Sequence, residues 1–251
     1  MTFSSFSDMG FAIIDISELQ HISKIREAIV NHLASQFSLT NCDPEHFLNN
    51  FHINASIHDD VAANAMILDL IRGISGNYDF STSIYESITP YLDELIGPDV
   101  MSQKNNNIVY QYPGSNRFSE LHTDYPTNSE FEVVSWVPLV NCFGSKSFYL
   151  VPLSDSIDLV SRFKDRQYAS WDDYKASCLS KAVHVEVNYS QCILFWTGLI
   201  HGSLINETNE SRWFLNARYK SLFAPFGQHD PLTYYKPLRY SALTRIALSS
   251  K

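Results

Sequence analysis

The segment "SELHTDYP" at residues 119–126 places a histidine and an aspartate two positions apart in a stretch typical of extended chain. Alternate residues of a strand point to the same side, so His122 and Asp124 would present a nitrogen and a carboxylate oxygen together. With nine histidines in 251 residues such a tripeptide is common by chance, and a second one begins at His58. The pair therefore needs a third ligand before it predicts a metal site.

The best third ligand is His201, in the segment "FWTGLIHGSLIN". It follows an apolar strand and precedes a turn, where a side chain can reach across the mouth of a barrel. Two histidines and one carboxylate that leave three coordination positions open form the facial triad of non-haem Fe(II) oxygenases. The same ligands also suit other divalent first-row ions, so they do not select iron on their own.

Two other histidine–acid pairs are better explained without a metal. Asp59 and Asp60, next to His58, stand where a helix is expected to begin, and acidic residues there cap the helix and offset its dipole. His184 and Glu186 alternate with valines in "AVHVEVNYS", which is typical of a strand with one face in water. We therefore expect neither pair to bind a metal.

An arginine suited to an anionic co-substrate follows the third ligand. Arg212 begins the segment "RWFLNARYKS" eleven residues after His201. If 2-oxoglutarate chelates iron at one end, its far carboxylate needs a planar, permanently charged partner inside the barrel. Arg218 shares this strand face but lies roughly 20 Å away, too far for one carboxylate to use both arginines. Two roles stay open for Arg218: contact with a substrate, or an ion pair with an acid at the rim.

A helical N-terminal part is predicted to support the site. After a first strand at 10–16, apolar residues at helical spacing predict a helix over 19–33. Two further helices are expected at 61–74 and 81–96, and the polar stretch 40–60 is expected to be a loop.

The remainder of the chain is predicted to be strand-rich. Short segments with many β-branched and aromatic residues, separated by turn residues, predict an antiparallel sheet between about 107 and 223. Residues 155–181 interrupt the strands with a polar, helical insertion. This insertion would either cover the barrel mouth as a lid or pack on the sheet. The C-terminal segment would pack on the barrel or form a dimer contact.

The composition excludes several classes of protein. A formal net charge of −9, without a lysine or arginine cluster, argues against nucleic acid and anionic membranes as partners. The apolar run 192–200 is too short for a membrane helix, and the N-terminus lacks a signal-peptide pattern. Four cysteines without CxxC spacing are expected to be reduced and mostly buried, with no zinc site. We expect one cytoplasmic domain over 1–251 that acts on a small molecule; its oligomeric state stays open.

In this order, the motifs resemble the Fe(II)/2-oxoglutarate-dependent dioxygenase superfamily, and within it the phytanoyl-CoA dioxygenase-like branch. The segments that carry the resemblance are "MGFAIID", "VYQYPGSNRFSELHTD", "VVSWVPLVNCFGSKSFYLVPLS", "QCILFWTGLIHGSLIN" and "ESRWFLNARYKSLFAP". The resemblance implies a mainly β fold: a double-stranded β-helix (jelly roll, cupin-like) over about 99–225 with helical support at about 17–97. It implies Fe(II) ligands at His122, Asp124 and His201 and a 2-oxoglutarate anchor at Arg212.

The resemblance also suggests residues around the co-substrate. Tyr110 or Gln111, on the strand before the HxD motif, would contact 2-oxoglutarate, and Asn206 resembles the asparagine commonly found after the distal histidine. The sequence departs from some relatives at Phe214, where they place a hydroxyl two residues after the anchoring arginine. The hydroxyl of Tyr110 or Thr197 would have to serve instead.

The implied reaction is the oxidation of a small polar metabolite by O2, with succinate and CO2 as co-products. Similarity to oxygenases of streptomycin-type and surface-polysaccharide gene clusters points to a sugar or a sugar-derived intermediate. Related halogenases replace the metal-binding carboxylate with a small residue, so an intact Asp124 favours hydroxylation or another two-electron oxidation. The alternatives are a cupin-like isomerase or lyase that uses no 2-oxoglutarate, which Arg212 speaks against, and a barrel that only binds a sugar or a protein.

Overall fold

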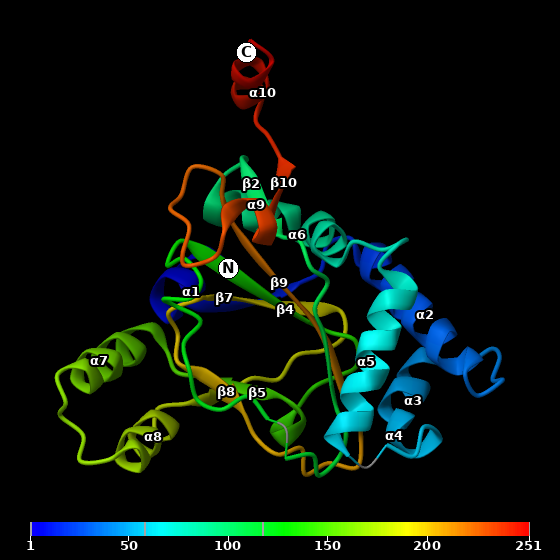
Figure 1. Cartoon of the computed structure of the whole chain (residues 1–251). Helices are drawn as coiled ribbons and strands as arrows, with labels where there is room; N and C mark the ends of the chain where they lie inside the picture. Colours follow the sequence, from blue (N-terminus) through cyan, green and yellow to red (C-terminus); the bar gives the residue numbers. More distant parts are fainter. Residues whose placement is uncertain (1, 58, 117, 251) are drawn as a thin grey trace.

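Two antiparallel sheets lie opposite each other in the computed structural model, which describes residues 2–57, 59–116 and 118–250 (Figure 1). The larger sheet has the order β1 (Phe11–Asp15), β7 (Gln191–Trp196), β4 (Glu132–Pro138), β9 (Arg212–Ser221), β2 (Val100–Gln103) and β10 (Tyr235–Arg239). The first residues of β9 also pair with β3 (Ile108–Gln111). The smaller sheet has the order β6 (Val183–His184), β5 (Phe148–Leu150) and β8 (His201–Ser203).

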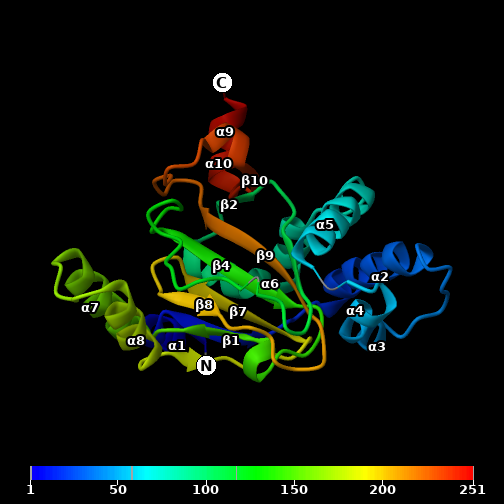
Figure 2. The same cartoon turned by 60° about the horizontal axis from the view of Figure 1, so that its bottom comes forward.

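Helices from the N-terminal part of the chain cover one side of these sheets (Figures 1 and 2). They are α2 (Leu19–Ser35), α3 (Pro44–Asn49), α4 (Phe51–Asn54), α5 (Asp60–Ile74) and α6 (Phe80–Ile96), and α1 (Thr2–Met9) precedes β1. The periodicity that predicted α2 is confirmed, because Ile22, Ile25 and Ile29 are completely buried on one face of it.

The loop expected at 40–60 is wrong in part, since α3 and α4 lie within it. The Asp43 side chain accepts a hydrogen bond from the His46 N–H, and Pro44 occupies the first helical position. An aspartate cap followed by proline is a helix-start signal, so the sequence did contain the information.

The predicted insertion is confirmed as helical, and it forms α7 (Leu153–Lys164) and α8 (Trp171–Leu179). The two helices project from the body on the side opposite α2 and α5 (Figures 1 and 2). They share a small buried cluster with the smaller sheet, which includes Leu121, Tyr149, Leu159, Tyr174 and Cys178. Packing on the sheet is therefore observed, whereas a role as a lid stays a prediction.

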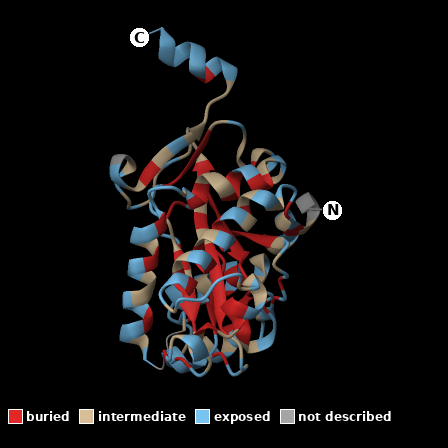
Figure 3. Ribbon diagram, turned by 90° about the vertical axis from the view of Figure 1, so that its right-hand side faces the viewer, coloured by how far each residue is buried: buried red, intermediate tan, exposed pale blue. Residues whose placement is uncertain are grey.

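The C-terminal segment packs on the sheet through β10, which pairs with β2. It also contains α9 (Pro231–Tyr234) and ends in α10 (Ala242–Ser249), which stands clear of the body with exposed residues around it (Figure 3). Buried residues concentrate in the two sheets, and all seven residues of β4 are buried. The structure is thus a mixed α and β fold with antiparallel sheets, richer in helix than the mainly β fold expected.

No helix within the described ranges is both long enough and apolar enough to cross a membrane. The four cysteines are free thiols, three of them buried, as expected.

Candidate functional site

Backbone hydrogen bonds bring the three proposed ligands together. The N–H of His122 donates to the His201 carbonyl over 3.0 Å, and the N–H of His201 donates back over 2.9 Å. The N–H of Asp124 donates to the Thr197 carbonyl over 2.9 Å. These bonds attach the loop that carries the HxD motif to β8 and to the turn before it. The backbone positions of His122, Asp124 and His201 are therefore fixed relative to one another.

The histidine rings are oriented for metal binding. Nδ1 of His122 lies 2.7 Å from the Glu120 carbonyl, and Nδ1 of His201 lies 2.9 Å from the Leu199 carbonyl. A ring N–H that donates to a carbonyl leaves the other nitrogen, Nε2, with a free lone pair. One donor atom each from His122, Asp124 and His201 lies within 4.8 Å of the others. It is the one such cluster of histidine, cysteine and acidic residues in the described part of the chain.

The protonation states also suit a metal. Burial lowers the pKa of His201 to about 4, so its ring is neutral near pH 7. Burial raises the pKa of the Asp124 carboxyl, but the positive charge of Arg218 and its hydrogen bond act against this, and the resulting pKa lies below its usual value. The site therefore offers a neutral imidazole at His201 and an ionised carboxylate at Asp124, the forms that bind divalent cations.

The three ligands open into a cavity of about 350 Å³ between the two sheets. Aromatic side chains form much of its wall, namely Trp136, Phe148, Phe195 and Phe214. Polar side chains interrupt this wall at Ser119, Ser203, Asn216, Arg212 and Arg218. A largely apolar pocket with a few polar groups is typical of a small-molecule site.

Arg212 lines the cavity as a buried cation without an acidic partner among the described residues. Its side chain is 4% exposed, and no described carboxylate lies within ion-pair distance of it. Nη1 donates to the Ser147 carbonyl over 2.6 Å and Nη2 donates to Ser203 Oγ over 3.4 Å, while Nε has no hydrogen-bond partner in the part of the chain that the structure describes. Burial lowers the pKa of Arg212 to about 10. Since an unpaired buried charge is costly, this arrangement indicates an anionic ligand.

The hydroxyl beside Arg212 belongs to Ser203, which the sequence reasoning missed. Ser203 lies two residues after His201 on β8. Because alternate residues of a strand point to the same side, the choice of His201 as a ligand would have predicted Ser203 beside it. Phe214, at the position where some relatives place a hydroxyl, instead lies under the guanidinium of Arg212, whose Cζ is 5.4 Å from the ring centre.

Four residues expected near the co-substrate lie outside the wall of the described cavity. Tyr110 packs its ring on Trp213, with 4.4 Å between ring centres, and Val109 faces the cavity in its place. Gln111 donates from Nε2 to the Leu204 carbonyl over 3.3 Å. Thr197 Oγ1 donates to the Ser129 carbonyl over 2.9 Å.

Asn206, the fourth of these residues, organises the loop between β8 and β9. Its Nδ2 donates to the Glu210 carbonyl over 2.7 Å, and its Oδ1 accepts from the Thr208 hydroxyl over 2.7 Å. Asn206 thus holds the loop that leads to Arg212.

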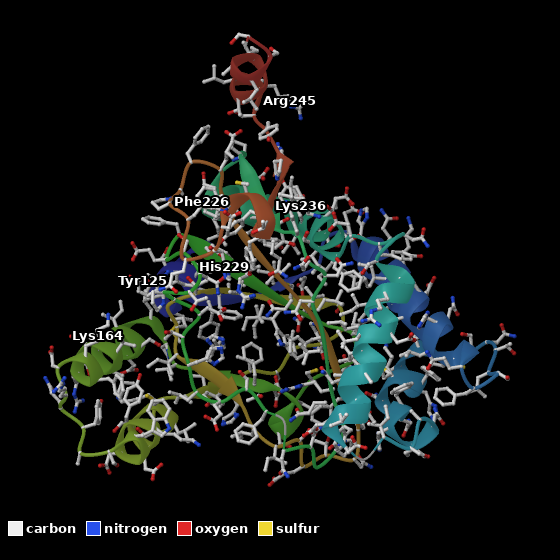
Figure 4. The ribbon with its side chains drawn as sticks, in the orientation of Figure 1. Tyr125, Lys164, Phe226, His229, Lys236 and Arg245 are labelled. Carbon is white, nitrogen blue, oxygen red and sulfur yellow. The ribbon has the colours of Figure 1, made fainter. Side chains whose placement is uncertain are left out.

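Arg218 pairs with an acid, as one of the two open roles proposed, but that acid is Asp124, a buried candidate ligand in the cavity wall and not a residue at the rim. Its Nη2 donates to Asp124 Oδ2 over 3.0 Å. The turn after Asp124 is held from another direction, because the Asp124 carbonyl accepts from the Asn128 N–H over 3.0 Å and Asn128 Oδ1 lies 3.1 Å from Nε2 of His229. His229 belongs to the C-terminal part of the chain, and Figure 4 labels it together with Tyr125 of this turn.

The competing pairs behave as expected where the structure describes them. Asp59 caps α5 by accepting a hydrogen bond from the Ala62 N–H over 2.8 Å, while His58 lies outside the described residues. His184 and Glu186 are exposed, and neither belongs to a cluster with metal-binding geometry.

No family model matches the chain, and no curated protein matches it in sequence. Solved structures do match. A non-haem monooxygenase, ThoJ in complex with nickel, is 15% identical with a TM-score of 0.53, over 96% of this chain and 84% of that one. The chain has the fold of non-haem oxygenases.

Two further structures that match are of proteins that bind or depend on 2-oxoglutarate. HygX from Streptomyces hygroscopicus, with nickel and 2-oxoglutarate bound, is 14% identical with a TM-score of 0.52, over 91% of this chain and 96% of that one. SnoK, a non-haem α-ketoglutarate-dependent carbocyclase from nogalamycin biosynthesis, is 12% identical with a TM-score of 0.50, over 91% and 86%. These neighbours agree with the resemblance to the superfamily. The narrower branch stays a prediction, and their differing reactions do not select hydroxylation.

Proposed function

We propose that this chain is an Fe(II)- and 2-oxoglutarate-dependent oxygenase that hydroxylates or otherwise oxidises a small polar metabolite. One observation carries the proposal: the cavity that holds the His122, Asp124 and His201 cluster also holds Arg212, a buried cation without a described counter-charge. A triad enzyme that uses no dicarboxylate has no need of such a cation. The cupin-like isomerase or lyase therefore explains the cavity less well.

The residues of the site fit both groups. His122, Asp124 and His201 would hold Fe(II), and Arg212 with the neighbouring Ser203 hydroxyl would bind the far carboxylate of 2-oxoglutarate. The bound iron and co-substrate would supply the oxidising chemistry with O2, and would yield succinate and CO2. The chain itself keeps His201 neutral, supplies the anionic ligand through Asp124 and lines the site with aromatic side chains.

The proposal also covers the type of β fold, the class of substrate and the role of the α7–α8 pair. We propose that the two sheets form a double-stranded β-helix of the phytanoyl-CoA dioxygenase-like branch. A polar substrate is supported by Asn216, which lines the cavity and whose buried Oδ1 has no hydrogen-bond partner within 2–57, 59–116 and 118–250. A hydroxyl group can donate to this oxygen, as a sugar or sugar-derived intermediate would. The α7–α8 pair would act as a lid beside the smaller sheet.

Succinate release tests the proposed function. Purified protein with Fe(II), 2-oxoglutarate, ascorbate and O2 should release succinate, and a panel of sugars and sugar nucleotides should contain compounds that accelerate the release. His201→Ala should abolish it because the third ligand is lost. His184→Ala, which changes an exposed histidine outside the cavity, is the matched control and should retain it. If the metal-loaded protein converts no 2-oxoglutarate with any compound, the proposal is wrong.

A further inference from the structure

Arg218 contacts the carboxylate that the proposed function assigns to iron, and the inference below rests on that function. Arg218 Nη2 donates to Asp124 Oδ2 over 3.0 Å, while Asp124 Oδ1 lies 3.7 Å from His122 Nε2. One carboxylate oxygen is thus engaged by a guanidinium, and the other faces the histidines. We propose that Arg218 is a positioning residue that restricts Asp124 to single-oxygen metal coordination and thereby keeps the adjacent coordination positions open for 2-oxoglutarate.

No other described side chain provides this restriction. Arg218 supplies the one side-chain hydrogen bond that the Asp124 carboxylate receives within the described ranges. The main chain of Asp124 is held separately, through the Thr197 carbonyl and the Asn128 N–H. A carboxylate with both oxygens free can bind one metal ion with either oxygen or with both. The contact from Arg218 removes the second oxygen from that choice.

Arg218 is itself held in place. It lies on β9 opposite Val134 of the fully buried strand β4, and its side chain is 16% exposed. Its Nη1 donates to Gln103 Oε1 of β2 over 3.4 Å. The guanidinium is therefore part of the cavity wall and does not belong to a mobile surface side chain. Ion pairs fixed in this way keep their geometry better than exposed pairs do.

The two arginines on this face of β9 differ in whether an acidic side chain balances their charge. Arg212 has no described acidic partner and is available to an incoming carboxylate, whereas Arg218 is already paired with Asp124. The roughly 20 Å between them along the strand prevents one from replacing the other. A substitution of Arg218, but not one of Arg212, should therefore change the coordination of the metal before 2-oxoglutarate is added.

Arg218 acts on a bound cation in two opposing ways. Its positive charge repels the cation, whereas its hydrogen bond orients the carboxylate that attracts it. Metal affinity alone is therefore a poor measure of positioning. The number of ligand atoms around the metal, and the space that remains for 2-oxoglutarate, report on it directly.

The test compares Co(II)-loaded proteins without 2-oxoglutarate and then titrates 2-oxoglutarate into Ni(II)-loaded proteins by calorimetry. The visible d–d bands of Co(II) depend on coordination number and geometry. Arg218→Met should change these bands before 2-oxoglutarate is added, and should weaken 2-oxoglutarate binding about 10-fold. Arg218→Lys, which keeps the charge and an N–H donor, should retain the wild-type bands. Arg212→Met, the matched control on the same strand face, should leave the bands unchanged without 2-oxoglutarate.

The proposal is overturned if Arg218→Met shows wild-type Co(II) bands, or if Arg218→Lys changes them as much as Arg218→Met does. Should Arg218→Met not fold, Arg218→Gln is assessed by the same criteria, because its side chain is two bonds shorter and does not reach Asp124. A wild-type protein that binds no Co(II) overturns both this inference and the proposed function. If it binds Co(II) but not 2-oxoglutarate, the proposed function fails, and the Co(II) bands still decide the role of Arg218.

Discussion

Replacing Arg212 with methionine should separate ligand binding from the stability of the fold. Arg212 is 4% exposed, and burial lowers its pKa well below the ordinary range of a guanidinium, to about 10. At about 1.4 kcal/mol per pKa unit, burial of this charge costs about 3 kcal/mol. The substitution removes that cost together with the hydrogen bonds to Ser147 and Ser203, each worth about 1 kcal/mol. The ligand-free variant should therefore gain about 1 kcal/mol in free energy of unfolding.

The same substitution should nearly abolish 2-oxoglutarate binding. Removing one partner of a buried ion pair costs about 3–5 kcal/mol. At about 1.4 kcal/mol per factor of ten, Arg212→Met should weaken the binding of 2-oxoglutarate by at least about 100-fold. The variant would thus fold at least as well as the wild type and fail to bind its ligand, which distinguishes a binding residue from a structural one.

Urea denaturation of the ligand-free proteins and calorimetry of 2-oxoglutarate with the Ni(II)-loaded proteins measure the two effects. The reasoning is refuted if Arg212→Met binds 2-oxoglutarate within about threefold of the wild type. It is also refuted if the ligand-free variant is less stable by more than about 2 kcal/mol, because the guanidinium would then be well satisfied inside the fold.

Further predictions concern the metal ligands and the packing beneath them. His201→Ala should weaken Ni(II) binding more than about 100-fold by calorimetry, whereas His184→Ala should leave it unchanged; equal affinities for the two variants would contradict the ligand assignment. Burial lowers the pKa of His201 to about 4 in the folded metal-free protein, whereas this side chain is protonated near pH 6.5 in the unfolded chain. Its free energy of unfolding in urea should therefore fall as the pH drops from about 6.5 to 4, by about 3 kcal/mol from this residue, and a slope as steep in His201→Ala would argue against this origin. Gly202→Ala would place a Cβ 2.5 Å from the Tyr149 hydroxyl, so thermal unfolding should show a loss of about 1–3 kcal/mol. Gly76→Ala meets no atom within 4 Å and should change stability by less than about 0.5 kcal/mol, and similar losses in the two variants would contradict the packing argument.

Sequence spacing predicted the central residues of the site because strand geometry is simple. The alternation rule put Arg212 and Arg218 on one face of β9 and His122 and Asp124 on one side of an extended segment, and the structure places all four at one cavity together with His201. His122 and Asp124 nevertheless lie in a loop with one isolated bridge at His122, and not in the strand that the rule assumed. Long amphipathic patterns likewise predicted α2, α5 and α6. These features depend on local periodicity, which a single sequence contains.

Features that depend on pairing between distant segments could not be predicted in this way. The strand β8 is only "HGS", without β-branched residues, and exists because it pairs with β5. Tyr110 and Val109 point to opposite sides of β3, and only the position of β3 between the cavity and the helical layer decides which one faces the cavity. The pairing of Arg218 with Asp124 likewise joins residues 94 positions apart, so it required the fold.

The central claim is that the three-ligand cluster and Arg212 form one site for Fe(II) and 2-oxoglutarate. Its most direct test is the anaerobic addition of Fe(II) and then 2-oxoglutarate to the purified protein, with detection of the weak visible charge-transfer band of the chelate. The account predicts a band in the wild type that is lost in His201→Ala and weakened in Arg212→Met. Bound Fe(II) without a band in the wild type would contradict the claim and remove 2-oxoglutarate from the function.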